Sequence, residues 1–181
     1  MLEIIIPKTE LFDSPNNRFI KIEEQTLRLE HSLVSLSKWE SKWHKPFLSD
    51  RYKTTYDELM DYIKCMTITQ NVKPEVYNAI TAKHIDQIKE YINTPQTATY
   101  FSKESGGDLD GKEVTSELIY YWMCELEIPW ESQKWHLSRL ITLIKVFNAE
   151  RKPKEKRSES DMWADYEALN KTRREKLKSK G

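Results

Sequence analysis

Glycine and cysteine are scarce in this chain, and no apolar run is long. Only four of the 181 residues are glycine. Tight β-hairpin turns use positive φ angles that glycine adopts most easily, so this scarcity favours helices joined by polar loops over a β-sandwich or barrel. No stretch reaches the roughly 20 apolar residues of a membrane-spanning helix. The apolar start of the chain lacks the basic residues and cleavage site of a signal peptide, so a membrane partner is not expected.

The cysteines and histidines predict no reaction centre. Cys65 and Cys124 lie far apart in segments with helical periodicity, which predicts two buried thiols in a reducing compartment and no disulfide. A cysteine–histidine catalytic pair is a formal alternative, but burial raises the pKa of a thiol and makes it inert. No two histidines have the spacing of paired metal ligands, and phosphate-binding and hydrolase motifs are absent. The sequence therefore predicts neither an enzyme nor a cofactor.

Charge is abundant but balanced, with 29 basic and 29 acidic residues. Only local concentrations of charge can therefore indicate a partner. Six of the final eleven residues are basic, and phosphate contact through this tail is an alternative function. No aromatic residues interleave with the basic ones to stack on bases, so nucleic acid is not the favoured partner.

Apolar periodicity changes along the chain and predicts a mostly α fold. The first thirty residues alternate apolar and polar positions around a turn-rich cluster at 13–17, which indicates two or three short antiparallel strands. From Ser32 onward, apolar residues recur every three or four positions. Capping-box spacing between Thr55 and Glu58 marks one helix start, and Thr81 is expected to cap another. Helices are expected at 33–43, 55–66, 74–80, 81–93, 113–128, 131–150 and 158–178.

These elements predict two parts. Residues 1–150 are expected to form a compact helical domain with a small antiparallel β element at its N-terminus. Its helix at 131–150 is apolar nearly all round, which predicts burial at the centre of the domain. Residues 151–181 are expected to form a charged linker and a C-terminal helical tail.

Tryptophan usage is the distinctive feature, with six indole rings in the chain. Indole buries a large area and keeps one N–H that needs a partner, so it suits both cores and interfaces. Three tryptophans are expected to fill the core: Trp39, Trp122 and Trp135. Trp130 lies in a proline-bounded turn and Trp163 in the hydrophilic tail, so these two are candidate partner-binding residues. The remaining candidates are Tyr166, Arg173 and Arg174.

Five segments together resemble a known class of viral protein. They are LEHSLVSLSKWESKWH at 29–44, CMTITQNV at 65–72, SELIYYWM at 116–123, QKWHLSRL at 133–140 and RREKLKSKG at 173–181. They are similar to small tail-gene products of long-tailed bacteriophages, in particular tail assembly chaperones. The resemblance implies a protein that coats the helical tape-measure protein in the host cytoplasm. It keeps that protein soluble until tail-tube subunits polymerise around it.

Two alternatives to the chaperone are kept. A structural virion protein, such as a minor tail or head–tail connector component, would need a permanent and more apolar interface. A small helical nucleic-acid-binding protein would use the basic tail. The expected partner is the tape-measure protein, and assembly into a homo-oligomer is left open.

Overall fold

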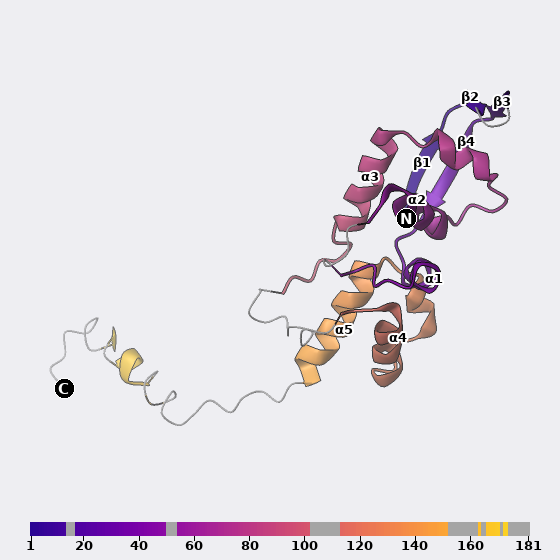
Figure 1. Cartoon of the computed structure of the whole chain (residues 1–181). Coiled ribbons are helices and arrows are strands. Elements are labelled where there is room, and N and C mark those ends of the chain that lie inside the picture. The colour runs from indigo at the N-terminus through magenta and orange to yellow at the C-terminus, as the bar shows by residue number, and fades with distance from the viewer. Residues whose placement is uncertain are drawn as a thin grey trace. The chain divides into compact units, whose positions relative to one another are not determined.

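The computed structural model divides into two units, Met1–Ala149 and Glu150–Gly181. It describes residues 1–13, 17–49, 54–101, 113–151, 163, 166–170 and 172–173. In the described part of the first unit, four strands precede five α-helices and two 3-10 helices (Figure 1). The strands form two antiparallel pairs, so the chain is mixed α/β and the prediction of a mostly α fold is wrong.

The strands form one long antiparallel ribbon. β1 (Leu2–Ile6) pairs with β4 (Gln25–Leu29), and β2 (Thr9–Asp13) pairs with β3 (Arg18–Ile22). In each ladder the sequence numbers of two paired residues add up to 31, as in Leu2 with Leu29 and Thr9 with Ile22. The two ladders therefore share one register. The interruption between them falls at Pro7, which has no N–H to donate. Four strands therefore replace the two or three that were predicted.

Residues other than glycine take the left-handed conformation at the turns of this chain. Asn17, which precedes β3, has a φ of 48°, and Asn71 has a φ of 58°. Asparagine tolerates this conformation because its short side chain can hydrogen-bond locally. His44 and Glu127 adopt positive φ as well. The scarcity of glycine therefore did not exclude the ribbon, which explains why its extent was underestimated.

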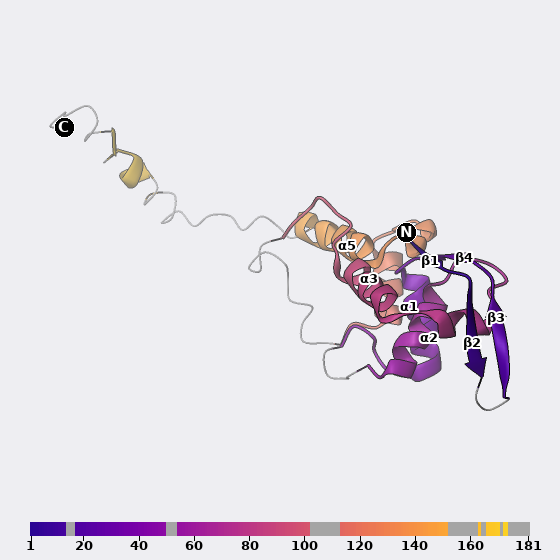
Figure 2. The same ribbon diagram turned by 90° about the horizontal axis from the view of Figure 1, so that it is seen from above.

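The ribbon buries opposite faces along its two halves. In β1 the even-numbered residues Ile4 and Ile6 are buried, whereas in β2 the even-numbered Phe12 is exposed and Leu11 is half-buried. Two-stranded ribbons twist strongly, and a change of face at the interruption is consistent with that twist. The β2–β3 half extends away from the helices (Figure 2), with Phe12 and Phe19 side by side on its solvent face.

The α-helices begin where polar side chains cap them. Thr55 and Glu58 form the predicted capping box, and Thr81 caps the next helix as expected. The predicted helix at 74–80 is a 3-10 helix, and the one at 131–150 is divided into a 3-10 helix and an α-helix. The helices are α1 (Leu33–Trp43), α2 (Tyr56–Met66), η1 (Pro74–Ala79), α3 (Ala82–Asn93), α4 (Ser116–Glu125), η2 (Trp130–Lys134) and α5 (Leu137–Arg151).

Two hydrophobic clusters make up the core, and α1 contributes to both. The first cluster lies among the ribbon, α2, η1 and α3, and it includes Trp39 of α1. The second lies among α1, α4 and α5, and it includes Leu33 and Leu36 of α1. Figure 1 shows α1 between the ribbon and the α4–α5 pair. α1 therefore buries apolar area in both clusters, in the second near its start and in the first near its end.

The prediction that the helix ending near residue 150 lies fully buried is wrong. In α5 only Leu137, Leu140 and Ile144 are buried. Three further apolar residues pack on the second cluster but are only half-buried: Ile141, Leu143 and Phe147. A helix that is apolar on several faces needs cover on each of them. Among the described residues, α5 has such cover on one face.

Glu40 joins α1 to α4 through a buried carboxylate. Its Oε1 accepts a hydrogen bond from the Phe47 N–H at 2.9 Å, and its Oε2 accepts one from the Ser116 N–H at 2.7 Å. Ser116 is the first residue of α4, where N–H groups lack partners within the helix. The carboxylate supplies that partner and is favoured by the positive end of the helix dipole.

Replacing Glu40 with alanine is expected to lower the free energy of unfolding by about 2–4 kcal/mol, because the buried Ser116 N–H and the partly buried Phe47 N–H lose their acceptor. Glu40→Gln keeps one acceptor oxygen and should cost less. Urea denaturation followed by circular dichroism measures both. Glu24→Ala, at an exposed position, is the matched control, and equal stability of the control and Glu40→Ala would contradict the prediction.

Candidate partner-binding surface

Two features that would indicate other functions are missing from the described residues. None of the helices in this part of the chain combines the length and the apolar character needed to cross a membrane. Within the same residues, no three His, Cys, Asp or Glu side chains are grouped to hold a metal ion. The titratable side chains of the interior gather in one buried cluster. The exposed aromatic side chains lie outside that cluster.

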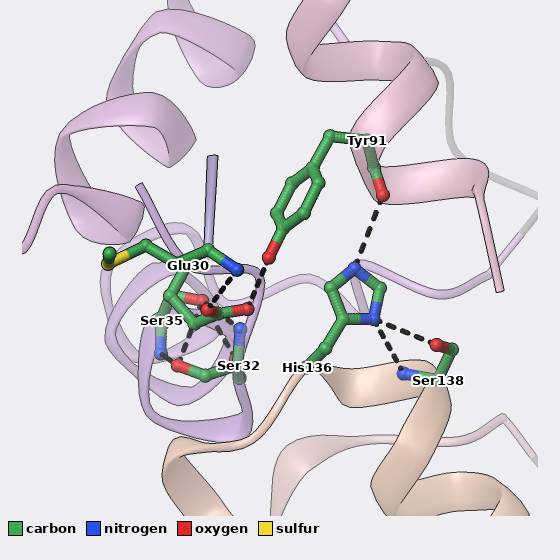
Figure 3. Close-up of polar contacts among 7 residues, drawn as sticks. Glu30, Ser32, Ser35, Tyr91, His136 and Ser138 are labelled. Carbon is green, nitrogen blue, oxygen red and sulfur yellow. Dashed lines mark hydrogen bonds and ion pairs between the residues drawn. The ribbon is translucent and has the colours of Figure 1, made fainter. Parts of the chain in front are cut away.

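A chain of polar contacts joins the end of the ribbon, α3 and the start of α5 (Figure 3). The Tyr91 hydroxyl donates to Glu30 Oε1 at 2.6 Å, and the Met1 ammonium lies 2.9 Å from Glu30 Oε2. His136 Nε2 lies 3.2 Å from the Tyr91 carbonyl oxygen, and its Nδ1 lies 2.8 Å from Ser138 Oγ. Because a carbonyl oxygen only accepts, the His136 proton is assigned to Nε2.

His31 extends this cluster toward α2. Its Nδ1 lies 2.5 Å from the Tyr62 hydroxyl, and its ring centroid lies 5.2 Å from that of His136. Burial raises the pKa of Tyr62, so its hydroxyl stays protonated and donates to His31. Burial, with a smaller contribution from His136, lowers the pKa of His31 to about 3. Burial lowers the pKa of His136 as well.

The cluster joins the two halves of the core. The Leu137 N–H donates to the His31 carbonyl oxygen at 2.7 Å, which ties the start of α5 to the segment before α1. His31 contacts Tyr62 of the first cluster, while Leu137 belongs to the second. Both histidines are buried and hydrogen-bonded within the protein. Their geometry accounts for packing between the two clusters.

The stability of the protein is expected to fall as the pH drops below 6.5. In that range the unfolded chain binds a proton at His31 whereas the folded chain does not, down to its pKa of about 3. The free energy of unfolding should therefore decrease by up to about 1.4 kcal/mol per pH unit from this group. Urea denaturation at pH 7, 6 and 5 measures the slope.

His31→Asn should flatten that slope, even though it also lowers the stability at pH 7. The range from pH 7 to pH 5 distinguishes the effect of histidines from that of acids. The lowered pKa values of Glu58 and Asp61 affect stability at more acidic pH. His84→Asn, which changes a histidine on the first turn of α3, is the control. An unchanged slope in His31→Asn would contradict the assignment.

The two thiols differ in exposure. Both cysteines are free; Cys65 is half-buried, with its pKa raised by burial, and Cys124 is exposed. The prediction of two buried thiols is therefore wrong for Cys124. Its neighbour Met123 is buried, but adjacent residues on a helix point about 100° apart. Cys124 thus lies on the solvent face of α4.

Cys124 is expected to react with Ellman's reagent at a rate about ten-fold or more above that of Cys65, because the reactive thiolate must form and be reached. The single variants Cys124→Ser and Cys65→Ser assign the two phases. Equal rates for the two thiols in the folded protein would show that α4 does not present Cys124 to solvent.

The candidate partner-binding residues lie in different units. Trp130 begins η2 in the first unit and is 54% exposed. Trp163, Tyr166 and Arg173 lie in the second unit, at exposed positions in helical conformation. Arg174 lies outside the described residues. Trp130 is therefore the candidate whose neighbouring side chains are described next.

One aromatic side chain, Tyr120, packs against Trp130. The Trp130 ring centroid lies 5.7 Å from that of Tyr120, whose hydroxyl is 3.0 Å from Gln133 Oε1. Tyr121, the next residue of α4, is 58% exposed. Sequence reasoning missed both tyrosines. The spacing of Glu117, Tyr121 and Glu125, each four residues apart, was the signal that they share one face of a helix.

The predicted core tryptophans have different environments. Trp39 is buried and donates its indole N–H to the Glu58 carbonyl oxygen at 2.9 Å, as expected for a core indole. Trp122 and Trp135 are only half-buried. The Arg139 guanidinium lies 4.3 Å from the Trp135 ring centroid, a cation–π contact.

Tyr120, Trp122 and the half-buried side of α5 pack against the second cluster. We define the α4–η2 surface as Glu117, Tyr120, Tyr121, Glu125, Glu127, Trp130 and Glu131. No protein-family model, curated protein or solved structure matches this chain. The phage-tail resemblance therefore stays a prediction, and the exposed aromatic and apolar side chains supply the structural argument for binding.

Proposed function

We propose that this protein is an assembly chaperone that holds a helical segment of another protein against α4, η2 and α5. The observation that carries the proposal is the incomplete cover of α5, where Ile141, Leu143 and Phe147 are only half-buried. An apolar helix face that is only partly covered fits the apolar stripe of a second helix. Trp130 of η2 and Tyr121 of α4 add exposed aromatic area in the same unit.

The resemblance to phage tail assembly chaperones supplies the partner in this proposal. A tape-measure protein is long and helical, and its apolar residues need cover before the tail tube forms. A chaperone must release its partner, so its site should be smaller and more polar than a permanent interface. Charged residues beside the aromatic ones on α4 agree with that requirement.

Co-expression with the tape-measure protein encoded by the same genome tests the proposal. The expected result is a soluble complex that co-purifies, whereas the tape-measure protein alone is insoluble. The double variant Leu143→Gln, Phe147→Gln should lose co-purification, because glutamine removes the apolar contact. Circular dichroism and thermal unfolding establish that this variant is folded.

Ile68→Gln is the matched control, because Ile68 is an exposed apolar residue outside α4, η2 and α5. It should leave the complex intact. Equal loss in the control and the double variant would place the binding site elsewhere. Presence of the protein in finished virions, with no complex on co-expression, would support the structural virion protein and overturn the chaperone.

A further inference from the structure

We infer that the segment held on the α4–η2 surface is a basic amphipathic helix, rich in lysine and arginine beside its apolar stripe. This inference rests on the proposed function and names the chemical class of its partner. It is drawn from the charges that accompany the exposed aromatic side chains and from how acids are paired elsewhere in the chain.

Acidic residues flank the exposed aromatic side chains of this surface. On α4, Glu117 and Glu125 stand one turn before and one turn after Tyr121. Glu127 and Glu131 are exposed on either side of Trp130. From Ser116 to Lys134 the sequence holds four acids and one basic residue, Lys134 itself. In a chain whose total charge is zero, this stretch carries a clear negative excess.

These four acids make no ion pair within the described part of the chain, whereas several acids elsewhere do. On the ribbon, Glu3 pairs with Arg28 at 2.9 Å and Glu10 with Lys21 at 3.4 Å. The ion pairs found among the described residues include none of the four acids near Tyr121 and Trp130. Within the described residues no basic side chain neutralises them by direct contact, so their charges can attract a cationic partner.

The aromatic side chains favour the same partner. The π face of an exposed indole or phenol attracts lysine and arginine, and the Arg139–Trp135 pair at 4.3 Å realises this contact nearby in the chain. The Tyr121 hydroxyl donates to Glu125, a contact that raises the pKa of the phenol and keeps it neutral. A helix that carries basic residues beside an apolar stripe can place its cations on these carboxylates and its apolar side chains on the aromatic rings.

Charge complementarity of this kind sets partner choice and association rate more than it sets affinity. An acidic partner helix would meet like charge at Glu117, Glu125 and Glu131 and be rejected. An uncharged apolar helix would bind without discrimination. A basic helix is attracted by each acidic residue of the surface, and this attraction should weaken as salt screens exposed charges.

Three synthetic helices of about 20 residues, long enough to cover the surface, test the inference. They share one leucine stripe, and their polar positions are all Lys, all Gln or all Glu. Binding to the full chain is followed by tryptophan fluorescence and by protection of Cys124 from Ellman's reagent. The Lys peptide should bind about ten-fold or more tightly than the Gln peptide, and its affinity should fall between about 50 and 300 mM salt.

Charge-reversal variants locate the effect. Glu125→Lys, Glu131→Lys should abolish the preference for the Lys peptide. The matched control is Glu24→Lys, Glu90→Lys. It makes the same change in net charge at exposed positions outside α4, η2 and α5, and it should leave the preference unchanged. Equal loss of preference in both variants would attribute it to net charge and overturn the inference.

The outcomes separate this inference from the proposed function. Equal binding of the three peptides, abolished by Leu143→Gln, Phe147→Gln, would keep the function and overturn the basic partner. No binding by any peptide would overturn both. Salt-sensitive self-association that Glu125→Lys, Glu131→Lys abolishes would identify a second copy as the occupant. Protection of Cys124 without peptide, lost in high salt, would identify the basic end of this chain itself. Either of these two results would overturn the inference that the occupant is a helix of another protein.

Discussion

The packing of α1 between two hydrophobic clusters is the contact on which the rest of the first unit depends. Trp39 belongs to the cluster under the ribbon, and Leu33 and Leu36 belong to the cluster of α4 and α5. Neither cluster closes without a face of this helix. The sequence provides for this with one apolar stripe on α1, whose first turns meet the second cluster and whose later turns meet the first.

Ion pairs join the end of α1 and the segment just after it to α2. Lys42 lies 2.6 Å from Asp61 of α2, and Lys45 lies 2.5 Å from Glu58. The hydrogen bond from Lys45 and one from the Thr55 N–H lower the pKa of Glu58, so its buried carboxylate stays charged. Burial opposes ionisation of Asp61, but hydrogen bonds from Lys42 and Trp43 outweigh it and lower its pKa. Buried charges of this kind are tolerated because each is paired and hydrogen-bonded.

Local features of the fold were predictable from the sequence, and features that depend on distant segments were not. The capping box of Thr55 and Glu58 lies within four residues, so its spacing alone indicates it. The hydrogen bond from Ser116 to Glu40 joins residues 76 apart, and no local pattern indicates it. The exposure of Phe147 has the same origin, because periodicity shows that a face is apolar but not which segment covers it.

The candidate surface shows the same limit of sequence patterns. Trp130 was recognised because a proline-bounded turn is exposed in most folds. Tyr121 was missed because it follows Tyr120 and precedes Trp122 in a run that looks like core. The acids four residues before and after it indicate an outward face, and the burial of Ile119 and Met123 marks the inward one. Cys124 was misplaced for the same reason.

The proposed surface must satisfy two opposing requirements. A chaperone keeps apolar area exposed while it waits for its partner, and exposed apolar area drives copies of a protein to associate. The acids beside Tyr121 and Trp130 meet both requirements at once. Two copies that approach through this surface bring like charges together, whereas a basic helix brings opposite charges. Half-burial of α5 and the local negative excess are therefore best understood as one feature: the apolar side chains provide contact area, and the acids determine which helix is accepted.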